Sequence, residues 1–259
     1  MLKPLLLASL ICLTPSYGQE TGAAHVAPAA KPDIKQINDH QFQIGKILLD
    51  QKKREISFGA GINMTQGLLE FLLVTTKSNK VHETLLLSDI SPLNLNIAFK
   101  LLGIAESPEL FEIVDEDYRP TGVYPEVDPK VTAASKIDII VEWGEGESKK
   151  SHPINELIHH IEWPKEDDHG FQPQDNLILE KATLSTMEAG PWLSTGSYIH
   201  EGQFKAEVDG IMFAIYTSQQ AIVNFPGKDR QAGDVWIPNE KIIQEEGTVV
   251  KIIIKPHQP

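Results

Sequence analysis

The chain has a single cysteine, Cys12, which lies inside the first apolar run of the sequence. Everything after this run therefore lacks a disulfide framework, a thiolate zinc site, an iron–sulfur cluster and a cysteine nucleophile. Basic residues are also scarce, since 23 Lys and Arg oppose 36 Asp and Glu and the formal net charge is −13. Because an acidic chain repels phosphate backbones, we expect no nucleic-acid partner.

Common catalytic motifs are missing as well. The sequence has no phosphate-binding loop, dinucleotide fingerprint, Gly-x-Ser-x-Gly elbow or His-Glu-x-x-His helix. Gly59-Ala60-Gly61 lacks a third glycine, and we interpret it as a bulge or turn. No cofactor is predicted. No later hydrophobic segment approaches the roughly 20 residues of a spanning helix, so no transmembrane segment is predicted in the mature chain.

Residues 1–18 are typical of a signal peptide. Lys3 provides the positive charge, residues 5–13 form an apolar run, and Ser16-Tyr17-Gly18 places small residues at the cleavage site. A membrane anchor is the alternative, but the apolar run is too short to span a bilayer. We therefore expect cleavage near Gly18 and a periplasmic or secreted protein.

The remaining chain divides into two parts. Residues 19–40 are rich in Ala and Pro and predict a flexible linker, because they cannot bury enough apolar surface to become ordered. Residues 41–259 predict a β-rich domain of about ten strands. The expected strands cover residues 42–49, 55–62, 68–75, 81–87, 137–143, 192–199, 204–208, 211–216, 221–225, 235–238 and 249–254.

Turn and cap signals complete the expected fold. Asp209-Gly210 between two apolar runs predicts a tight hairpin. Ser91, Pro92 and Gly103 are typical of the cap, first residue and stop of a helix. Residues 154–162 predict a second helix. The predicted fold class is α+β, a mainly antiparallel β-sheet with about two helices in a single compact domain.

The segment Lys80-Val81-His82-Glu83 is the first candidate for chemistry. A His–carboxylate pair can serve in acid–base catalysis or bind a metal ion. Consecutive side chains of a strand point to opposite faces, so only one of His82 and Glu83 could face a site. Glu70, in a predicted neighbouring strand, could lie beside either of them. The ordinary alternative is a hydrogen-bonded histidine at a strand edge.

Two further candidates lie elsewhere. Glu156 and His160 are four residues apart on the predicted second helix and could form half a metal site, or simply a polar helix face. Ser197 follows Gly196 and could act as a nucleophile beside a suitable base, or belong to a tight turn.

Aromatic and acidic groups provide the last candidates. Residues 166–169, three acidic residues and a histidine, could bind calcium or form a solvated loop. The tryptophans could form a ligand-stacking surface, although buried packing is their ordinary use; they are Trp143, Trp163, Trp192 and Trp236.

Several segments together resemble a known family, the YdjY-domain proteins. Residues 67–74 (GLLEFLLV), 80–86 (KVHETLL) and 92–103 resemble its N-terminal signature. Residues 192–197 (WLSTGS), 209–210, 221–226 (AIVNFP) and 247–252 (GTVVKI) resemble its C-terminal half. The insert over residues 148–176 is longer than this pattern. The resemblance implies an exported bacterial protein with one continuous domain and assigns no activity; its motifs include Glu70, His82, Glu83, Gly196 and Ser197.

Two functions follow as hypotheses. The first is an exported non-catalytic binding or structural module of the bacterial cell envelope, with a small ligand, an envelope polymer or a protein as its partner. The absence of a complete nucleophile–base–orienter set favours it. The alternative is a hydrolase or metal-assisted enzyme with a site built around His82 and Glu83. Under either hypothesis the candidate functional surface comprises Glu70, Lys80, His82, Glu83, Gly196 and Ser197.

Overall fold

The computed structural model describes residues 33–117, 119–163 and 182–258. The predicted signal peptide, the linker up to residue 32 and the acidic residues 166–169 lie outside the described residues. The sequence assigns residues 19–40 to the linker, but β1 (Ile34–Gln36) pairs with β2 (Gln41–Ile44). The folded domain therefore already includes Ile34.

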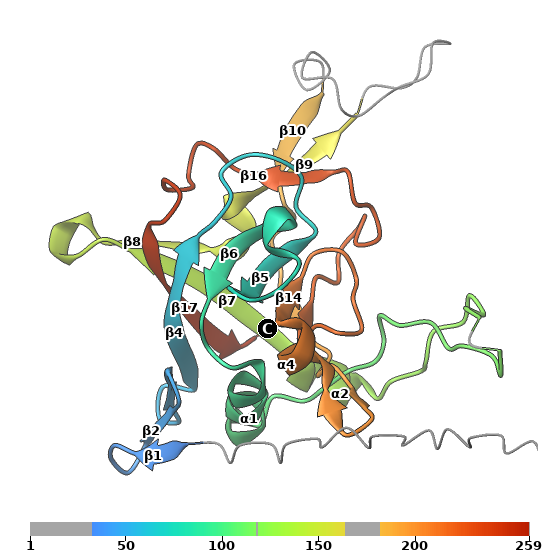
Figure 1. Ribbon diagram of the computed structural model, residues 1–259, viewed down its shortest axis with the longest axis horizontal. Helices are drawn as coiled ribbons and strands as arrows, with labels where there is room; N and C mark the ends of the chain where they lie inside the picture. The colour runs from blue at the N-terminus through green and yellow to red at the C-terminus, as the bar shows by residue number, and fades with distance from the viewer. Residues whose placement is uncertain (1–32, 118, 164–181, 259) are drawn as a thin grey trace, which may run out of the picture. The chain divides into compact units, whose positions relative to one another are not determined.

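Eight strands of the described residues close into a barrel (Figure 1). The pairs Gly61–Leu87 and Ile62–Leu86 join the first and last of them. The order around the barrel is β4 (Glu55–Ile62), β17 (Val249–Pro256), β7 (Lys136–Trp143), β11 (Trp192–Ser194), β15 (Val223–Asn224), β14 (Ile211–Ala214), β5 (Phe71–Thr75) and β6 (Thr84–Ser88).

The barrel confirms the β-rich α+β class and corrects its detail. β5 pairs with β6 in parallel, and β14 pairs with β15 in parallel, whereas the other neighbours in the barrel are antiparallel. The sheet is therefore mixed and barrel-like, not mainly antiparallel as predicted. Closure removes the exposed edges that an open sheet of this size would present.

Further strands extend from the barrel. β2 and β3 (Ile47–Asp50) continue the sheet outward from β4, and β8 (Lys150–Pro153) pairs with β7. A separate small sheet contains β10 (Thr183–Thr186), β9 (Ile158–Glu162) and β16 (Trp236–Pro238), and β12 (Ile199–His200) pairs with β13 (Gln203–Phe204). The predicted strand over residues 42–49 is thus a hairpin, because Gly45 turns the chain with a φ of 57°.

The core lies inside the barrel. Along β7, buried and partly exposed residues alternate at every position, so one face is fully covered. The helix α1 (Pro92–Leu102) contributes Leu95 and Phe99 to the same core. Inward side chains from three adjacent strands include Ile56, Phe58, Ile139, Val141, Ile252 and Ile254.

The first predicted helix is confirmed as α1. The Ser91 hydroxyl accepts a hydrogen bond from Asn94 N at 3.2 Å, and Gly103 ends the helix in the left-handed region with a φ of 76°. A shorter helix, α2 (Pro129–Ser135), precedes β7. None of the helices in the described ranges is long and apolar enough to cross a bilayer.

One turn prediction and one helix prediction are wrong. Asp209-Gly210 does not form a hairpin, because residues before it form the helix α4 (Lys205–Asp209), which Gly210 ends with a φ of 71°. The predicted second helix is a 3-10 turn, η3 (Ile154–Leu157), followed by β9. Pairing of β9 with strands on both sides outweighs the helical spacing of its apolar residues.

Candidate functional site

Residues 81–83 form a short 3-10 turn, η1 (Val81–Glu83), so the strand predicted over residues 81–87 begins only at Thr84, as β6. Asn63 holds this turn, because its Nδ2 donates to Val81 O within the turn at 2.8 Å and to Thr84 O directly after it at 2.7 Å. Side chains three residues apart meet in such a turn, and Lys80 Nζ donates to Glu83 Oε1 at 2.7 Å. The turn therefore fixes the carboxylate of Glu83 beside a cation.

Glu70 lies next to this turn, as predicted from its position in the sequence. Its backbone N–H donates to the carbonyl oxygen of Glu83 at 3.0 Å. Burial raises the pKa of the Glu70 carboxyl and the charge of Glu83 raises it further, while Lys80 acts in the opposite direction. Glu70, Lys80 and Glu83 thus form one interacting group, called here the Glu70–Glu83 cluster.

His82 lies only at the exposed edge of this cluster. Its side chain is 74% exposed, and its Nε2 lies 3.9 Å from Glu83 Oε1, beyond hydrogen-bonding distance. The prediction of a hydrogen-bonded histidine at a strand edge is therefore wrong as well. An imidazole that faces solvent is poorly placed to act on a substrate in a site that excludes water.

Gly196 and Ser197 lie in a different part of the barrel. A Cβ atom at Gly196 would lie 2.3 Å from Glu106 Cδ, and its φ of 84° also requires glycine. The Ser197 hydroxyl accepts a hydrogen bond from Ala206 N at 3.2 Å, in the first turn of α4. Among the described residues, no histidine or carboxylate is hydrogen-bonded to this hydroxyl. Both positions therefore have evident structural roles.

The other predicted pair, Glu156 and His160, is separated because its helix does not form. Glu156 Oε2 lies 2.8 Å from His152 Nδ1, whereas His160 Nε2 lies 2.9 Å from Asp229 Oδ2. Sequence reasoning missed both of these His–carboxylate pairs. His152 and Glu156 are only four residues apart, whereas His160 and Asp229 are 69 residues apart and no local spacing connects them. Within the described ranges, no three His, Cys, Asp or Glu side chains converge as metal ligands.

The tryptophans serve mainly as packing groups. Trp192 is fully buried, and Trp236 and Trp143 are 2% and 7% exposed. Trp163 is half-buried, and its Nε1 donates to Asp234 O at 2.9 Å. The expectation of buried packing is confirmed for the first three.

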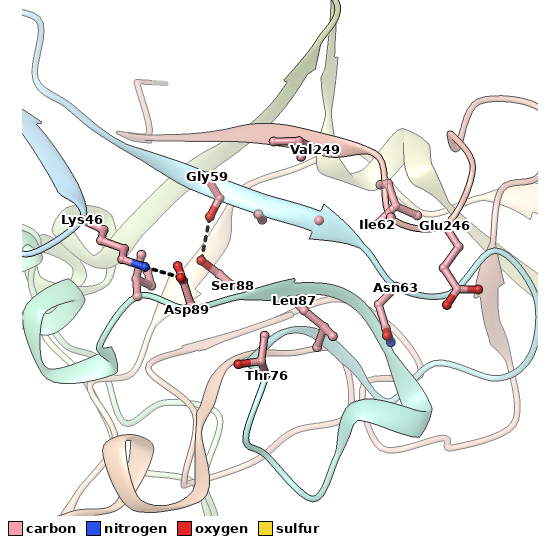
Figure 2. Close-up of a pocket in the computed structure, with 14 residues that line it drawn as sticks. Lys46, Gly59, Ile62, Asn63, Thr76, Leu87, Ser88, Asp89, Glu246 and Val249 are labelled. Atoms are coloured by element: carbon pink, nitrogen blue, oxygen red, sulfur yellow. Dashed lines mark hydrogen bonds and ion pairs between the residues drawn. The ribbon is translucent and has the colours of Figure 1, made fainter.

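A groove of about 850 Å³ lies on the outer face of β4, between β6 and β17 (Figure 2). Its floor is the backbone at Gly59 and Gly61. Leu87 of β6 and Val249 of β17 lie on either side of Gly61, since both pair with it in the sheet. Its volume is in the range of pockets that bind small molecules.

The two glycines create the groove, and nothing in their surroundings requires glycine. A Cβ atom at Gly59 would meet no heavy atom within 4 Å, and at Gly61 only Thr248 O at 4.0 Å. Neither residue is among those with positive φ, and β4 pairs with β17 in unbroken register past both. The predicted bulge or turn is therefore wrong. Glycine inside a regular strand often marks a place where a ligand or another backbone approaches closely.

The groove has polar groups along one side and charges at its ends. Ser88 Oγ donates to Gly59 O at 2.6 Å and fixes β6 against β4. Figure 2 shows the ion pair between Lys46 and Asp89 at one end and Glu246 at the other. Asn63, which holds the η1 turn, also lines the groove. Asn63 therefore links the groove to the η1 turn that contains Glu83.

Comparison of the chain with protein-family models, curated proteins and solved structures found no match.

Proposed function

We propose that the protein is an exported, non-catalytic binding module of the bacterial cell envelope, with its ligand site in the groove over β4. The observation that carries the proposal is the uncovered strand face at Gly59 and Gly61, where side chains would have room at their Cβ atoms. Such side chains would bury apolar surface and stabilise the fold. Functional sites often forgo available stability in this way. Export is supported by residues 1–18 and by the resemblance to YdjY-domain proteins.

The alternative is a hydrolase or metal-assisted enzyme built around His82 and Glu83. The raised pKa of Glu70 beside Glu83 favours it, because perturbed carboxyls are common in active sites. Structural carboxyl networks perturb pKa values as well. The exposure of His82 and the separate location of Ser197 support the binding module over the enzyme.

Fragment screening by NMR on the chain without its predicted signal peptide tests the proposal. We expect small apolar and aromatic fragments to shift the backbone amide resonances of Gly59 and Gly61. Gly59→Val should abolish these shifts by filling the groove. Ser151→Val is the matched control, because this exposed residue lies in the same cross-strand row, three strands away through Glu142 and Lys251.

The two hypotheses predict different patterns in this screen. Fragments that bind at the Glu70–Glu83 cluster, persist in Gly59→Val and disappear in Glu83→Gln would overturn the proposal in favour of the alternative. Export is tested separately by N-terminal sequencing of the protein recovered outside the cytoplasm, which should begin near Gln19.

A further inference from the structure

The two glycines on the groove floor are spaced like alternate residues of an extended peptide. Gly59 and Gly61 lie two residues apart on the outer face of β4, so the notches above them are separated by about 6.6 Å, at 3.3 Å per residue. Every second side chain of an extended peptide faces the same side with this spacing. Leu87 and the 79% exposed Val249 give the notch over Gly61 apolar walls. Two successive side chains of one peptide face would therefore fit the two notches.

Beyond Gly61 the groove becomes acidic. Glu246, at its end, also lines an adjoining pocket of about 330 Å³ together with Glu240 and Glu245. All three side chains are exposed, and none forms an ion pair with another described residue. At the opposite end, by contrast, Lys46 and Asp89 neutralise each other. The free charge of the groove is thus negative and lies at one end.

We infer, on the basis of the proposed function, that the groove binds an extended peptide segment of a partner protein with the pattern apolar-x-apolar-x-Lys or Arg. The two apolar side chains occupy the notches over Gly59 and Gly61. The basic residue follows two positions later, over the end of β4, and its long side chain reaches the pocket lined by Glu240, Glu245 and Glu246. Figure 2 shows this order along the strand, with Asn63 and Glu246 beyond Ile62.

Charge and shape together favour a basic peptide over other occupants. The net charge of −13 attracts cations and repels anionic polymers and anionic lipid surfaces. A free polyamine would satisfy the glutamates but would leave the notches and the apolar walls at Leu87 and Val249 uncovered. A peptide satisfies both regions, and its backbone can approach closely because the floor has no side chains.

Titration with synthetic capped peptides tests the inference. The probe has the core Val-Ser-Val-Ser-Lys, and its matched partner has Glu in place of Lys. We expect the Lys peptide to shift the amide resonances of Gly59, Gly61 and Gly247. The Glu peptide should bind at least about tenfold more weakly, because attraction to several carboxylates is replaced by repulsion. Added salt should reduce this difference.

Two sets of variants locate the contacts. Gly59→Val and Gly61→Val should each abolish binding of the Lys peptide, whereas Ser151→Val should not change it. The double variant Glu245→Gln, Glu246→Gln should bring the affinities of the two peptides close together. Each variant is first compared with the wild type in its thermal unfolding, so that loss of binding is not confused with loss of folding.

The outcomes separate this inference from the proposed function. If neither peptide binds while small fragments still occupy the groove and are lost in Gly59→Val, the peptide inference is wrong and the binding module stands. If spermine causes the same shifts as the Lys peptide, the site recognises a cation alone and the inference is also wrong. If neither fragments nor peptides bind the groove, both proposals fail.

Discussion

The inner and outer faces of β4 differ in how completely they are covered. On the inner face, Phe58 is 4% exposed and Ala60 is 7% exposed, within the closely packed barrel core. On the outer face, Gly59 is exposed and Gly61 is half-buried, although both positions have room for a side chain. Both faces belong to one strand with one register, so backbone geometry does not explain the difference.

The contrast separates two uses of a small residue. Gly196 and Gly210 are required by their surroundings, because each has positive φ and a Cβ atom there would collide with a neighbour. Gly59 and Gly61 satisfy neither condition. Because neither packing nor backbone conformation requires glycine at these two positions, we look for their role in binding and not in the fold.

The largest change in stability is expected from a substitution on the inner face of β4. Phe58→Ala removes a buried aromatic ring and leaves a cavity, so the free energy of unfolding should fall by about 3–5 kcal/mol. Chemical denaturation measures this change. A loss within the about 0.5 kcal/mol typical of surface substitutions would contradict close packing inside the barrel and remove the contrast between the faces.

The next largest change in stability is expected where β6 contacts the groove floor. Ser88 is 3% exposed, and its hydroxyl donates to Gly59 O. Ser88→Ala should lower the free energy of unfolding by about 0.5–1.5 kcal/mol, because a partly buried hydrogen bond is lost. Ser151→Ala, on exposed β8, is the control and should change stability by no more than about 0.5 kcal/mol. Equal effects of both variants would show that the floor is not held by this contact.

For the glycine on the groove floor, the expected change in stability has the opposite sign. Gly59→Ala should raise the free energy of unfolding by about 0.4–1 kcal/mol, because it restricts the unfolded chain without strain in the folded one. Gly210→Ala should instead destabilise, since its φ is 71° and the added Cβ would lie 2.1 Å from Thr75 Oγ1. Thermal and chemical unfolding of both variants measure the two signs. Destabilisation by Gly59→Ala would show that β4 needs glycine for its own conformation.

These regions also differ in how far the sequence predicts them. Short apolar or alternating runs predicted β4 and β7, and the cap signals of Ser91 and Gly103 predicted α1, because these signals are local. The hairpin predicted at Asp209-Gly210 was wrong because a hairpin turn and a helix end both require a residue in the left-handed region. Nothing near residue 209 in the sequence distinguishes the two.

Sequence reasoning predicted only the part of the site whose residues lie close together along the chain. Glu70 was expected beside His82 or Glu83, and it lies beside Glu83. The groove was not predicted, because whether Gly59 and Gly61 are covered depends on which strands flank β4. Those strands are β6 and β17, and the latter lies almost 200 residues further along the chain. Two glycines at alternate positions of an apolar strand were the available signal.

The smallest effect is expected at the Glu70–Glu83 cluster, where solvent screens a partly exposed charge. Because burial and the charge of Glu83 raise the pKa of Glu70, the folded state favours its neutral form. This stability is complete below the ordinary pKa of a glutamate and is lost as the pH rises through the raised pKa.

Glu70→Gln should therefore be more stable than the wild type at neutral pH and equal to it in acid. Thermal unfolding at both pH values measures the difference, with the exposed Glu116→Gln as a control that should change neither. A variant less stable at neutral pH would mean that attraction to Lys80 dominates, and that this cluster, like the inner face of β4, is built for stability.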